Sequence, residues 1–362
     1  MKPEAAIVPT ALWTPDDIAQ HDLDSLLNPE LDAALTDLDG NAPMLAGMAR
    51  YHLGLVDAAF QDALVGPALR GKRVRPSIAM LSCAAAGGSP AKAAPLAAAI
   101  ELLHNFTLIH DDIQDESPSR RHRPTVWKLW GIGQAINAGD ALFGAAQLAL
   151  LRAHERNLAA DVVLKLGESF NRVTIEIVKG QVLDLGFEGR DDVRASDYLQ
   201  MIEGKTSAIV RFAAWGGAVV AGASDAVANR FAAFGLALGL GFQIRDDLLG
   251  IWGAAAATGK AEADDIRRRK QSLPIVLLRE RVSPADRKTL HRLYEQPEIS
   301  EAGIPTVLEL LDHYEVREAV EQYIGTYHDA AERHLAEAAG SGQNPARDAL
   351  LGLIEALSTR TT

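Results

Sequence analysis

Long apolar segments rich in alanine and leucine dominate this sequence, and they constrain the fold more than any other feature. They cover residues 93–115, 137–155, 160–187, 195–222 and 226–250. Their residue types favour helices, whereas runs that alternate polar with β-branched or aromatic residues are almost absent. Several segments are apolar nearly all round, as expected of helices buried inside a bundle. The sequence therefore predicts an all-α fold, a large antiparallel helical bundle around a central cavity.

Glycine and proline mark the expected helix ends, at residues 87–90, 117–118, 123–124 and 186–189. No linker rich in Pro, Gly or Ser follows about residue 40, and no repeat of fixed period is found. We therefore predict a single domain over residues 29–362, preceded by an N-terminal extension at residues 1–28.

Composition narrows the classes of function. Cys83 is the one cysteine, which excludes an intramolecular disulfide and a multi-cysteine zinc site and fits the cytoplasm. The N-terminus has no apolar signal core, and apolar stretches such as residues 231–242 are too short to span a bilayer, so no transmembrane segment is expected. The net charge of -12 argues against nucleic acid as a partner, and the scattered basic clusters suit a small polyanion better.

One apolar segment ends in the acidic motif DDIQD at residues 111–115. Asp111 and Asp115 lie one helical turn apart on the same face, and His104 continues that face toward the N-terminus. The two carboxylates repel each other, and the C-terminus of a helix disfavours anions further. Such oxygen ligands suit Mg²⁺ bridged to phosphates. Taken alone, the motif is more often a solvated acidic helix end.

A second acidic pair, Asp246-Asp247, also ends an apolar segment. Helical projection places Gln243, Asp246 and Asp247 within one arc of about 100 degrees. Two acidic patches that face each other across a cavity would form a metal clamp.

Basic residues accompany both acidic motifs, and a bound diphosphate needs such charge-assisted donors. Arg120 and Arg121 directly follow the first motif. Taken singly, each basic residue is more commonly a surface charge, so their significance lies in their co-occurrence. The further candidates are Lys72, Arg75, Lys205, Lys260 and Lys270.

In this order the motifs resemble those of the trans-isoprenyl diphosphate synthase (polyprenyl synthetase) family. The resemblance extends from about residue 40 to about residue 290 and implies the class I isoprenoid synthase fold and a homodimer. It also implies a prenyltransferase that condenses an allylic diphosphate with isopentenyl diphosphate, head to tail and in the trans configuration. The matching elements are residues 71–76 (GKRVRP), 104–115, 120–125 (RRHRPT), Gly139-Asp140, Gly180-Gln181, Lys205-Thr206, Phe242-Gln243 and Asp246-Asp247.

The resemblance also implies roles for individual residues. The ligands of three Mg²⁺ ions would be Asp111, Asp115 and Asp246, with Asp112 and Asp247 as further ligands or as partners of the ligands. The allylic diphosphate would contact Arg120, Lys205, Gln243 and Lys260, whereas isopentenyl diphosphate would contact Lys72, Arg75, His104 and Arg121. Thr206 and Lys270 are assigned to substrate binding as well. The catalytic set is Asp111, Asp112, Asp115, Arg120, Lys205, Asp246 and Asp247.

Two positions depart from the family pattern. Gly250 stands where the second motif usually has a third aspartate, which weakens one corner of the clamp. An acidic pair follows closely at residues 264–265, so we expect metal binding to survive. His122 replaces a usual glycine and is interpreted as a neutral loop substitution.

The residues before the first acidic motif carry a clue to product length. In the family they line the far end of the product cavity, where a bulky side chain stops elongation. Phe106 and the smaller Thr107 resemble the arrangement of archaeal-type geranylgeranyl diphosphate synthases more than that of the double-aromatic farnesyl synthases. We therefore predict a C20 product, with C15 as the alternative, from dimethylallyl, geranyl or farnesyl diphosphate. Phe106 could instead be core packing, with the floor set by a neighbouring helix.

A terpene cyclase and a non-catalytic subunit are the two alternative functions. A class I terpene cyclase would share the metal chemistry but would not need Lys72, Arg75 and Arg121. A non-catalytic subunit of a heteromeric synthase would be expected to lose the first acidic motif, which is intact here.

Overall fold

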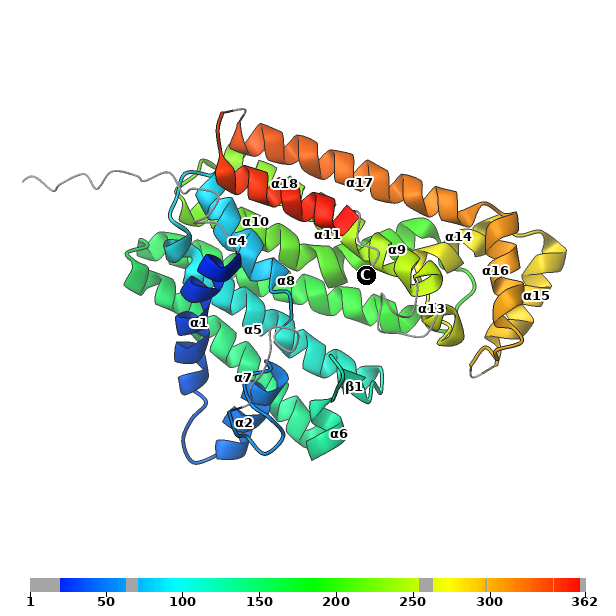
Figure 1. Ribbon diagram of the computed structural model, residues 1–362, viewed down its shortest axis with the longest axis horizontal. Coiled ribbons are helices and arrows are strands. Elements are labelled where there is room, and N and C mark those ends of the chain that lie inside the picture. The colour runs from blue at the N-terminus through cyan, green and yellow to red at the C-terminus, as the bar shows by residue number, and fades with distance from the viewer. Residues whose placement is uncertain (1–19, 63–70, 254–262, 297, 341, 359–362) are drawn as a thin grey trace, which may run out of the picture.

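The computed structural model describes residues 20–62, 71–253, 263–296, 298–340 and 342–358 (Figure 1). The described chain is almost entirely helical, and its two short strands form one hairpin. This confirms the predicted all-α bundle. In chain order the elements are α1 (Gln20–Thr36), α2 (Pro43–His52), α4 (Val74–Ala85), α5 (Pro90–Gln114), β1 (Ser119–Arg120), β2 (Arg123–Pro124), α6 (Val126–Trp130), α7 (Ile132–Leu151), η2 (Arg152–Arg156), α8 (Ala160–Phe187), α9 (Ala195–Ile202), η3 (Glu203–Ser207), α10 (Ala208–Val220), α11 (Asp225–Trp252), α13 (Asp264–Arg267), α14 (Leu273–Arg281), α15 (Pro284–Tyr294), α16 (Ile304–His313), α17 (Val316–Ala339) and α18 (Pro345–Ser358).

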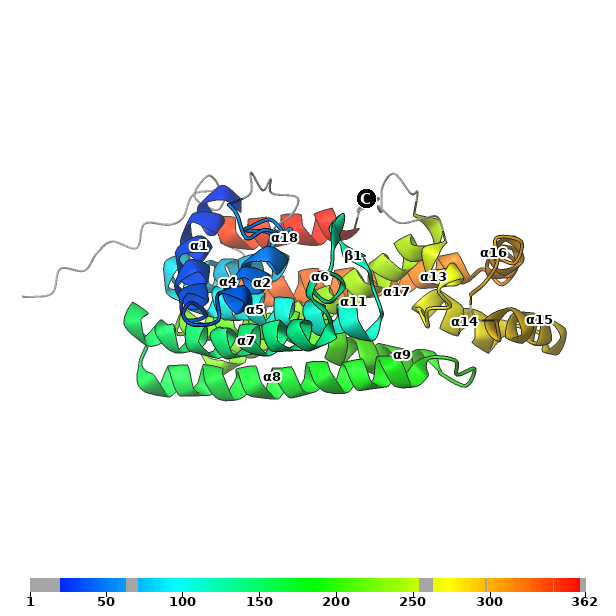
Figure 2. The same ribbon diagram turned by 90° about the horizontal axis from the view of Figure 1, so that it is seen from below.

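Helices α5, α10 and α11 form the centre of the bundle. α5 packs along α7, and α10 packs between α4 and α11. α11 in turn packs along α17, while α7 and α8 run side by side along one face (Figure 2). The helices α13 to α16 gather at the end of the molecule where α11 finishes (Figure 1).

Two hydrophobic cores flank the ends of α5 and α11. The larger core is formed by α1 to α8, α10, the first half of α11, the second half of α17 and α18. The smaller core holds the second half of α11 with α9, α13 to α16 and the first half of α17. The first acidic motif ends α5 of the larger core, and the second lies on the part of α11 that belongs to the smaller core.

The segment predicted as one helix over residues 195–222 is interrupted by a π-helical turn, η3. There its backbone crosses α8 closely, because both helices carry glycine at the crossing. A Cβ atom on Gly180 would lie 2.2 Å from the backbone nitrogen of Lys205, and one on Gly204 would lie 2.9 Å from the carbonyl oxygen of Glu176. π turns of this kind are often found at functional sites.

Helix α11 is long and apolar enough to cross a membrane by length and composition, with a mean hydropathy of 1.3 over the tested window. However, 56% of that window is buried inside the protein, as is typical of a core helix. Among the described helices it is the only one with both this length and this composition.

Helix α1 spans the predicted boundary between extension and domain at residue 28. Leu23 and Leu27 are buried in the larger core, so the described part of the extension packs against the bundle. Asp24 and Asn28 also accept hydrogen bonds from Arg73, at 3.1 and 2.6 Å. The first half of α1 thereby holds the arginine that directly precedes α4.

Candidate active site

The first acidic motif occupies the last turn of α5, where one of its carboxylates is held by an arginine. Asp112 is buried and accepts two hydrogen bonds from Nε of Arg120, at 2.9 and 3.1 Å, with Nη2 2.8 Å from Oδ1. Burial raises the pKa of Asp112, and Arg120 opposes that shift. This pairing favours a role for Asp112 as a partner of the ligands.

Asp111 and Asp115 have no hydrogen bond from an arginine among the described residues, in contrast to Asp112. Burial raises the pKa of Asp111 to about 6; Lys205 opposes the shift, and the Asp115 and Asp184 carboxylates add to it. Burial also raises the pKa of Asp115, with Lys205 again the main opposing charge. The ammonium group of Lys205 therefore faces this pair of carboxylates and compensates only part of their negative charge.

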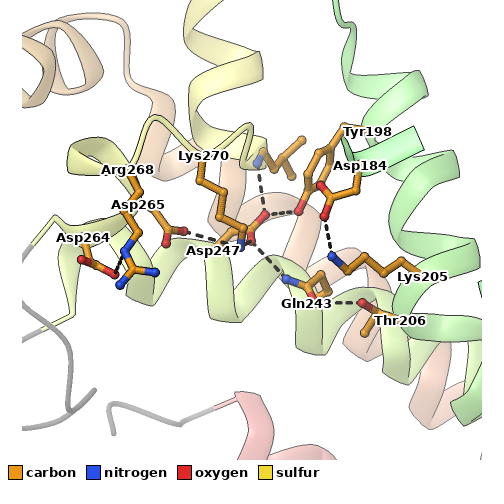
Figure 3. Close-up of polar contacts among 11 residues, drawn as sticks. Asp184, Tyr198, Lys205, Thr206, Gln243, Asp247, Asp264, Asp265, Arg268 and Lys270 are labelled. Atoms are coloured by element: carbon orange, nitrogen blue, oxygen red, sulfur yellow. Dashed lines mark hydrogen bonds and ion pairs between the residues drawn. The ribbon is translucent and has the colours of Figure 1, made fainter. Parts of the chain in front are cut away.

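Lys205 reaches this position from the π turn. Its ammonium group forms an ion pair with Asp184, which lies one turn beyond Gly180 on α8 (Figure 3). The close crossing of η3 and α8 brings the two side chains together. The glycine at residue 180, predicted only as part of a motif, thus has a structural purpose.

The second acidic motif is organised around Asp247, which is fully buried and surrounded by donors (Figure 3). Its carboxylate accepts hydrogen bonds from the hydroxyl of Tyr198, the backbone N–H of Leu273 at 3.1 Å and the amide of Gln243 at 3.2 Å. Lys270 lies 3.4 Å away. Burial raises the pKa of Asp247, and these partners oppose the shift. The saturated carboxylate favours a supporting role for Asp247.

Lys270 stands between the two motifs. Burial alone would lower its pKa, but the surrounding carboxylates raise it above its ordinary value, chiefly Asp265 and Asp247, with smaller contributions from Asp184 and Asp246. The same ammonium group lowers the pKa of Asp115 on the opposite motif. Lys205 therefore acts on the first acidic motif, and Lys270 acts on both motifs.

A cavity of about 320 Å³ adjoins Asp246. Its lining includes the cationic side chains of Lys72, Arg75 and Arg121 and the apolar side chains of Ile78, Val210 and Leu238. Such a lining suits a ligand that combines a charged head group with a hydrocarbon chain.

The backbone conformation of the β1–β2 turn and the glycine at residue 71 allow Arg121 to reach this cavity. Arg121 and His122 both have positive φ, 51° and 60°, and form the two-residue turn between β1 and β2. A Cβ atom on Gly71 would lie 2.8 Å from Nη2 of Arg121, so the glycine leaves room for the guanidinium. The left-handed conformation of His122 explains why glycine, which adopts it without strain, is usual there.

Arg75 is prepared for an anion. Its Nη1 donates to Nε2 of His104 at 3.2 Å, while its buried Nε has no hydrogen-bond partner among the described residues. Burial and then the charge of Arg75 lower the pKa of His104 well below its ordinary value, so the neutral ring accepts this hydrogen bond. Burial lowers the pKa of both Arg75 and Arg121, and the buried carboxylate of Glu101 opposes that shift. A buried guanidinium N–H without a partner is costly unless a ligand accepts it.

The structure brings most predicted site residues together. Thr206 donates to Gln243 at 2.9 Å, so both ends of the Gln243 amide are engaged within the protein. The Phe106 ring makes an edge contact with His110 of its own helix and a tilted contact with Phe143 of α7. The Thr107 hydroxyl donates to the backbone carbonyl of His104. Lys260 lies outside the described residues.

Sequence reasoning missed three residues of this site: Glu101, Asp184 and Tyr198. The first two had a usable signal, because Glu101 lies one turn before His104 and Asp184 one turn after Gly180 on the same helix. Tyr198 had none, because its contact with Asp247 arises only from packing between distant segments.

The donor set suits Mg²⁺, although the protein alone does not complete a coordination shell. No group of three or more His, Cys, Asp or Glu side chains within the described ranges could hold a metal ion. Mg²⁺ is commonly bound by one or two carboxylates together with substrate phosphates and water. The aspartate oxygens, whose charge is only partly compensated at Asp111 and Asp115, fit that mode of binding.

Comparison with known proteins agrees with the fold and the site. Residues 59–311 match the family described as Polyprenyl synthetase, and the chain belongs to this family. A (2E,6E)-farnesyl diphosphate synthase of Mycobacterium tuberculosis is 40% identical over 250 residues, which cover 69% of this chain and 67% of the relative. A geranylgeranyl diphosphate synthase of the same organism is 41% identical over 253 residues, 70% of each chain. The crystal structure of a polyprenyl synthetase from Streptomyces coelicolor A3(2) superposes with a TM-score of 0.82, at 34% identity, covering 95% of this chain and 99% of the other.

We expect Asp111→Asn to stabilise the metal-free protein near pH 7.5. Because the pKa of Asp111 is raised from 3.8 to about 6, the folded state binds this proton more tightly than the unfolded state does. The ionised carboxylate therefore lowers the free energy of unfolding above about pH 6, and this penalty fades as the pH falls toward about 4. Thermal unfolding in EDTA at both ends of this range measures the difference between variant and wild type.

The matched control is Asp329→Asn, on the exposed face of α17. A gain for Asp111→Asn that is equally large at both pH values would contradict the proposed cause.

Proposed function

We propose that this protein is a Mg²⁺-dependent trans-prenyltransferase that condenses an allylic diphosphate with isopentenyl diphosphate to a short-chain prenyl diphosphate. The observation that carries the proposal is the cationic cavity beside the paired acidic motifs. It provides a second anion site, with Lys72, Arg75 and Arg121, next to the metal-binding one. A terpene cyclase has no use for that second site, and a non-catalytic subunit has no use for the intact first motif.

The allylic diphosphate would bind between the two motifs. Asp111, Asp115 and Asp246 would hold the Mg²⁺ ions, three in number by family resemblance. When bound, the metal supplies positive charge that stabilises departing pyrophosphate. Lys205 and Lys270 already stand between the motifs and would add cationic charge at the same place.

Isopentenyl diphosphate would bind beside the cationic side chains of the cavity. Arg75 offers an Nε that has no hydrogen-bond partner among the described residues, and neutral His104 keeps the guanidinium in position. The apolar side chains of the cavity would exclude water from the allylic cation. The double bond then attacks that cation, and the released pyrophosphate accepts the proton lost from the product.

Product length is proposed from the aromatic residues near the first motif. The Phe106 ring lies 5.3 Å from Phe143 of α7, and Phe143 stacks at 6.4 Å on the buried Phe170 of α8. This row of rings would form the floor that limits the length of the product. We favour geranylgeranyl diphosphate, with farnesyl diphosphate as the alternative; the two relatives from M. tuberculosis carry both names at nearly equal identity.

The direct test incubates the purified protein with Mg²⁺, labelled isopentenyl diphosphate and each of dimethylallyl, geranyl and farnesyl diphosphate. Sizing the dephosphorylated products identifies the reaction, the preferred starter and the chain length. Products formed from an allylic diphosphate without uptake of label would indicate a cyclase instead.

Arg121→Ala should raise the KM for isopentenyl diphosphate far more than the KM for the allylic substrate. Losing one charge-assisted contact costs about 1.5 to 3 kcal/mol, or about one to two decades in affinity. Steady-state kinetics with each substrate varied in turn measures both constants. A rise confined to the allylic KM would show that the two sites are exchanged.

Phe106→Ala should shift the products to longer chains, because it removes one ring from the floor. The change should also lower the free energy of unfolding by about 3 kcal/mol. Phe231→Ala, which removes a fully buried ring of α11, is the control that loses stability without lengthening the product. An unaltered product distribution from folded Phe106→Ala protein would place the floor elsewhere.

We further propose a homodimer in the cytoplasm. Helices α7 and α8 lie side by side on one face of the bundle (Figure 2). Both helices expose large apolar side chains, and exposed patches of this kind are typical of protein interfaces. Cys83 is buried, and burial raises the pKa of its thiol to about 12, which fits an unreactive cysteine in a reducing compartment. The exposed side chains are Ile132, Ile136, Leu148, Leu151, Leu164, Ile175, Val178 and Val182.

Light scattering at micromolar concentration should therefore give twice the mass of one chain. Ile175→Glu combined with Val182→Glu should shift the protein toward the monomer, because charges would be buried in the interface. Glu substitutions at Leu129 and Met44, which are exposed outside α7 and α8, serve as the control. A monomeric wild type would contradict the proposal.

A further inference from the structure

The missing side chain of Gly250 leaves a space that another carboxylate occupies. Gly250 lies one turn beyond Asp246 on α11, where the resemblance leads one to expect a third aspartate. A Cβ atom on Gly250 would lie 2.3 Å from Oδ2 of Asp265 and 2.5 Å from its Cγ. The Asp265 carboxylate therefore stands where the side chain of residue 250 would begin.

Asp265 faces the charged centre of the site. It belongs to α13, beyond the end of α11, and is only 4% exposed. Its Oδ2 lies 3.8 Å from Nζ of Lys270, the ammonium group that also lies 3.4 Å from Asp247 (Figure 3). The backbone N–H of Lys270 donates to the carbonyl of Asp265 at 2.9 Å, which closes the turn that carries both residues.

The neighbouring Asp264 has a different environment. Its carboxylate lies 3.3 Å from Nε of Arg268 and 3.9 Å from Nη1 of Arg267, on the side away from Lys270 (Figure 3). Of these two adjacent aspartates, only Asp265 contacts the site. The pair thus provides a matched comparison for any test of Asp265.

We propose that Asp265 supplies the third carboxylate of the second acidic motif, and that Gly250 is the residue that makes room for it. This inference rests on the proposed function. Asp265 acts as a positioning residue: it holds Lys270 beside the bound diphosphate and restores the negative charge that the motif lacks next to Asp246. The clamp is then built from two segments of chain, α11 and α13, instead of from α11 alone.

The first measurement is calorimetric titration of the full-length protein with inorganic pyrophosphate in the presence of Mg²⁺. Asp265→Asn keeps the shape of the side chain but removes its charge. Binding should weaken by roughly 10- to 100-fold, as is common when a group that orients metal ligands is lost. Asp264→Asn should bind as tightly as the wild type.

The second measurement exchanges the two positions. Asp265→Ala should weaken Mg²⁺-dependent pyrophosphate binding, and adding Gly250→Asp in the same chain should restore it, because the carboxylate then projects from α11 into the vacated space. Gly250→Ala alone should weaken binding by displacing Asp265. Gly325→Ala, at a helical glycine of α17 with nothing within 4 Å of the added atom, controls for the change in helix propensity.

The outcomes separate this inference from the proposed function. Wild-type protein that binds no pyrophosphate with Mg²⁺ and makes no product would overturn the proposed function. If the wild type binds but Asp265→Asn binds equally well, the role of Asp265 is wrong while the function stands. Failure of Gly250→Asp to rescue a folded Asp265→Ala variant would likewise overturn the exchange.

Discussion

The mutual repulsion of carboxylates near the C-terminal ends of two apolar helices is the constraint on which this structure depends. The C-terminus of a helix disfavours negative charge, yet α5 carries aspartates in its last turn, and α11 carries Asp246 and Asp247 shortly before it ends at Trp252. The protein relieves part of this repulsion with Arg120 at Asp112 and with the donors around Asp247. It leaves Asp111 and Asp115 only partly compensated. The remaining electrostatic energy favours binding of cations and of the anions that accompany them.

Close backbone approaches place the compensating cations. Lys205 reaches the first motif because glycine at residues 180 and 204 lets η3 and α8 touch. Arg121 reaches the cavity because Gly71 leaves space and the hairpin turn tolerates positive φ. In each case the charged residue is effective only because a neighbouring residue lacks a side chain. Glycine at these positions therefore affects the electrostatics of the site, because it allows the cations to approach.

The helical bundle and the main site residues could be predicted from the sequence, because both follow from local patterns. Helical propensity defined the long segments, and the one-turn spacing of Asp111 and Asp115 placed them on one face. The π turn could not be predicted, since residues 203–207 continue the helical pattern without a break and only the crossing with α8 distorts them. Likewise the contact of Tyr198 with Asp247 depends on the packing of α9 against α11.

Asp247 shows why the two members of an acidic pair need not share a function. Adjacent residues on a helix point about 100 degrees apart, so one can face the cavity while the other faces the protein. Asp246 lines the cavity, whereas Asp247 is buried among donors from α9, α11 and the start of α14. The same division holds at α5, where Asp112 is buried against Arg120 while Asp111 and Asp115 face Lys205. In each motif the buried aspartate pairs with a neighbouring cation, and the aspartates beside it are held on a rigid helix, where they can bind a ligand with little further loss of entropy.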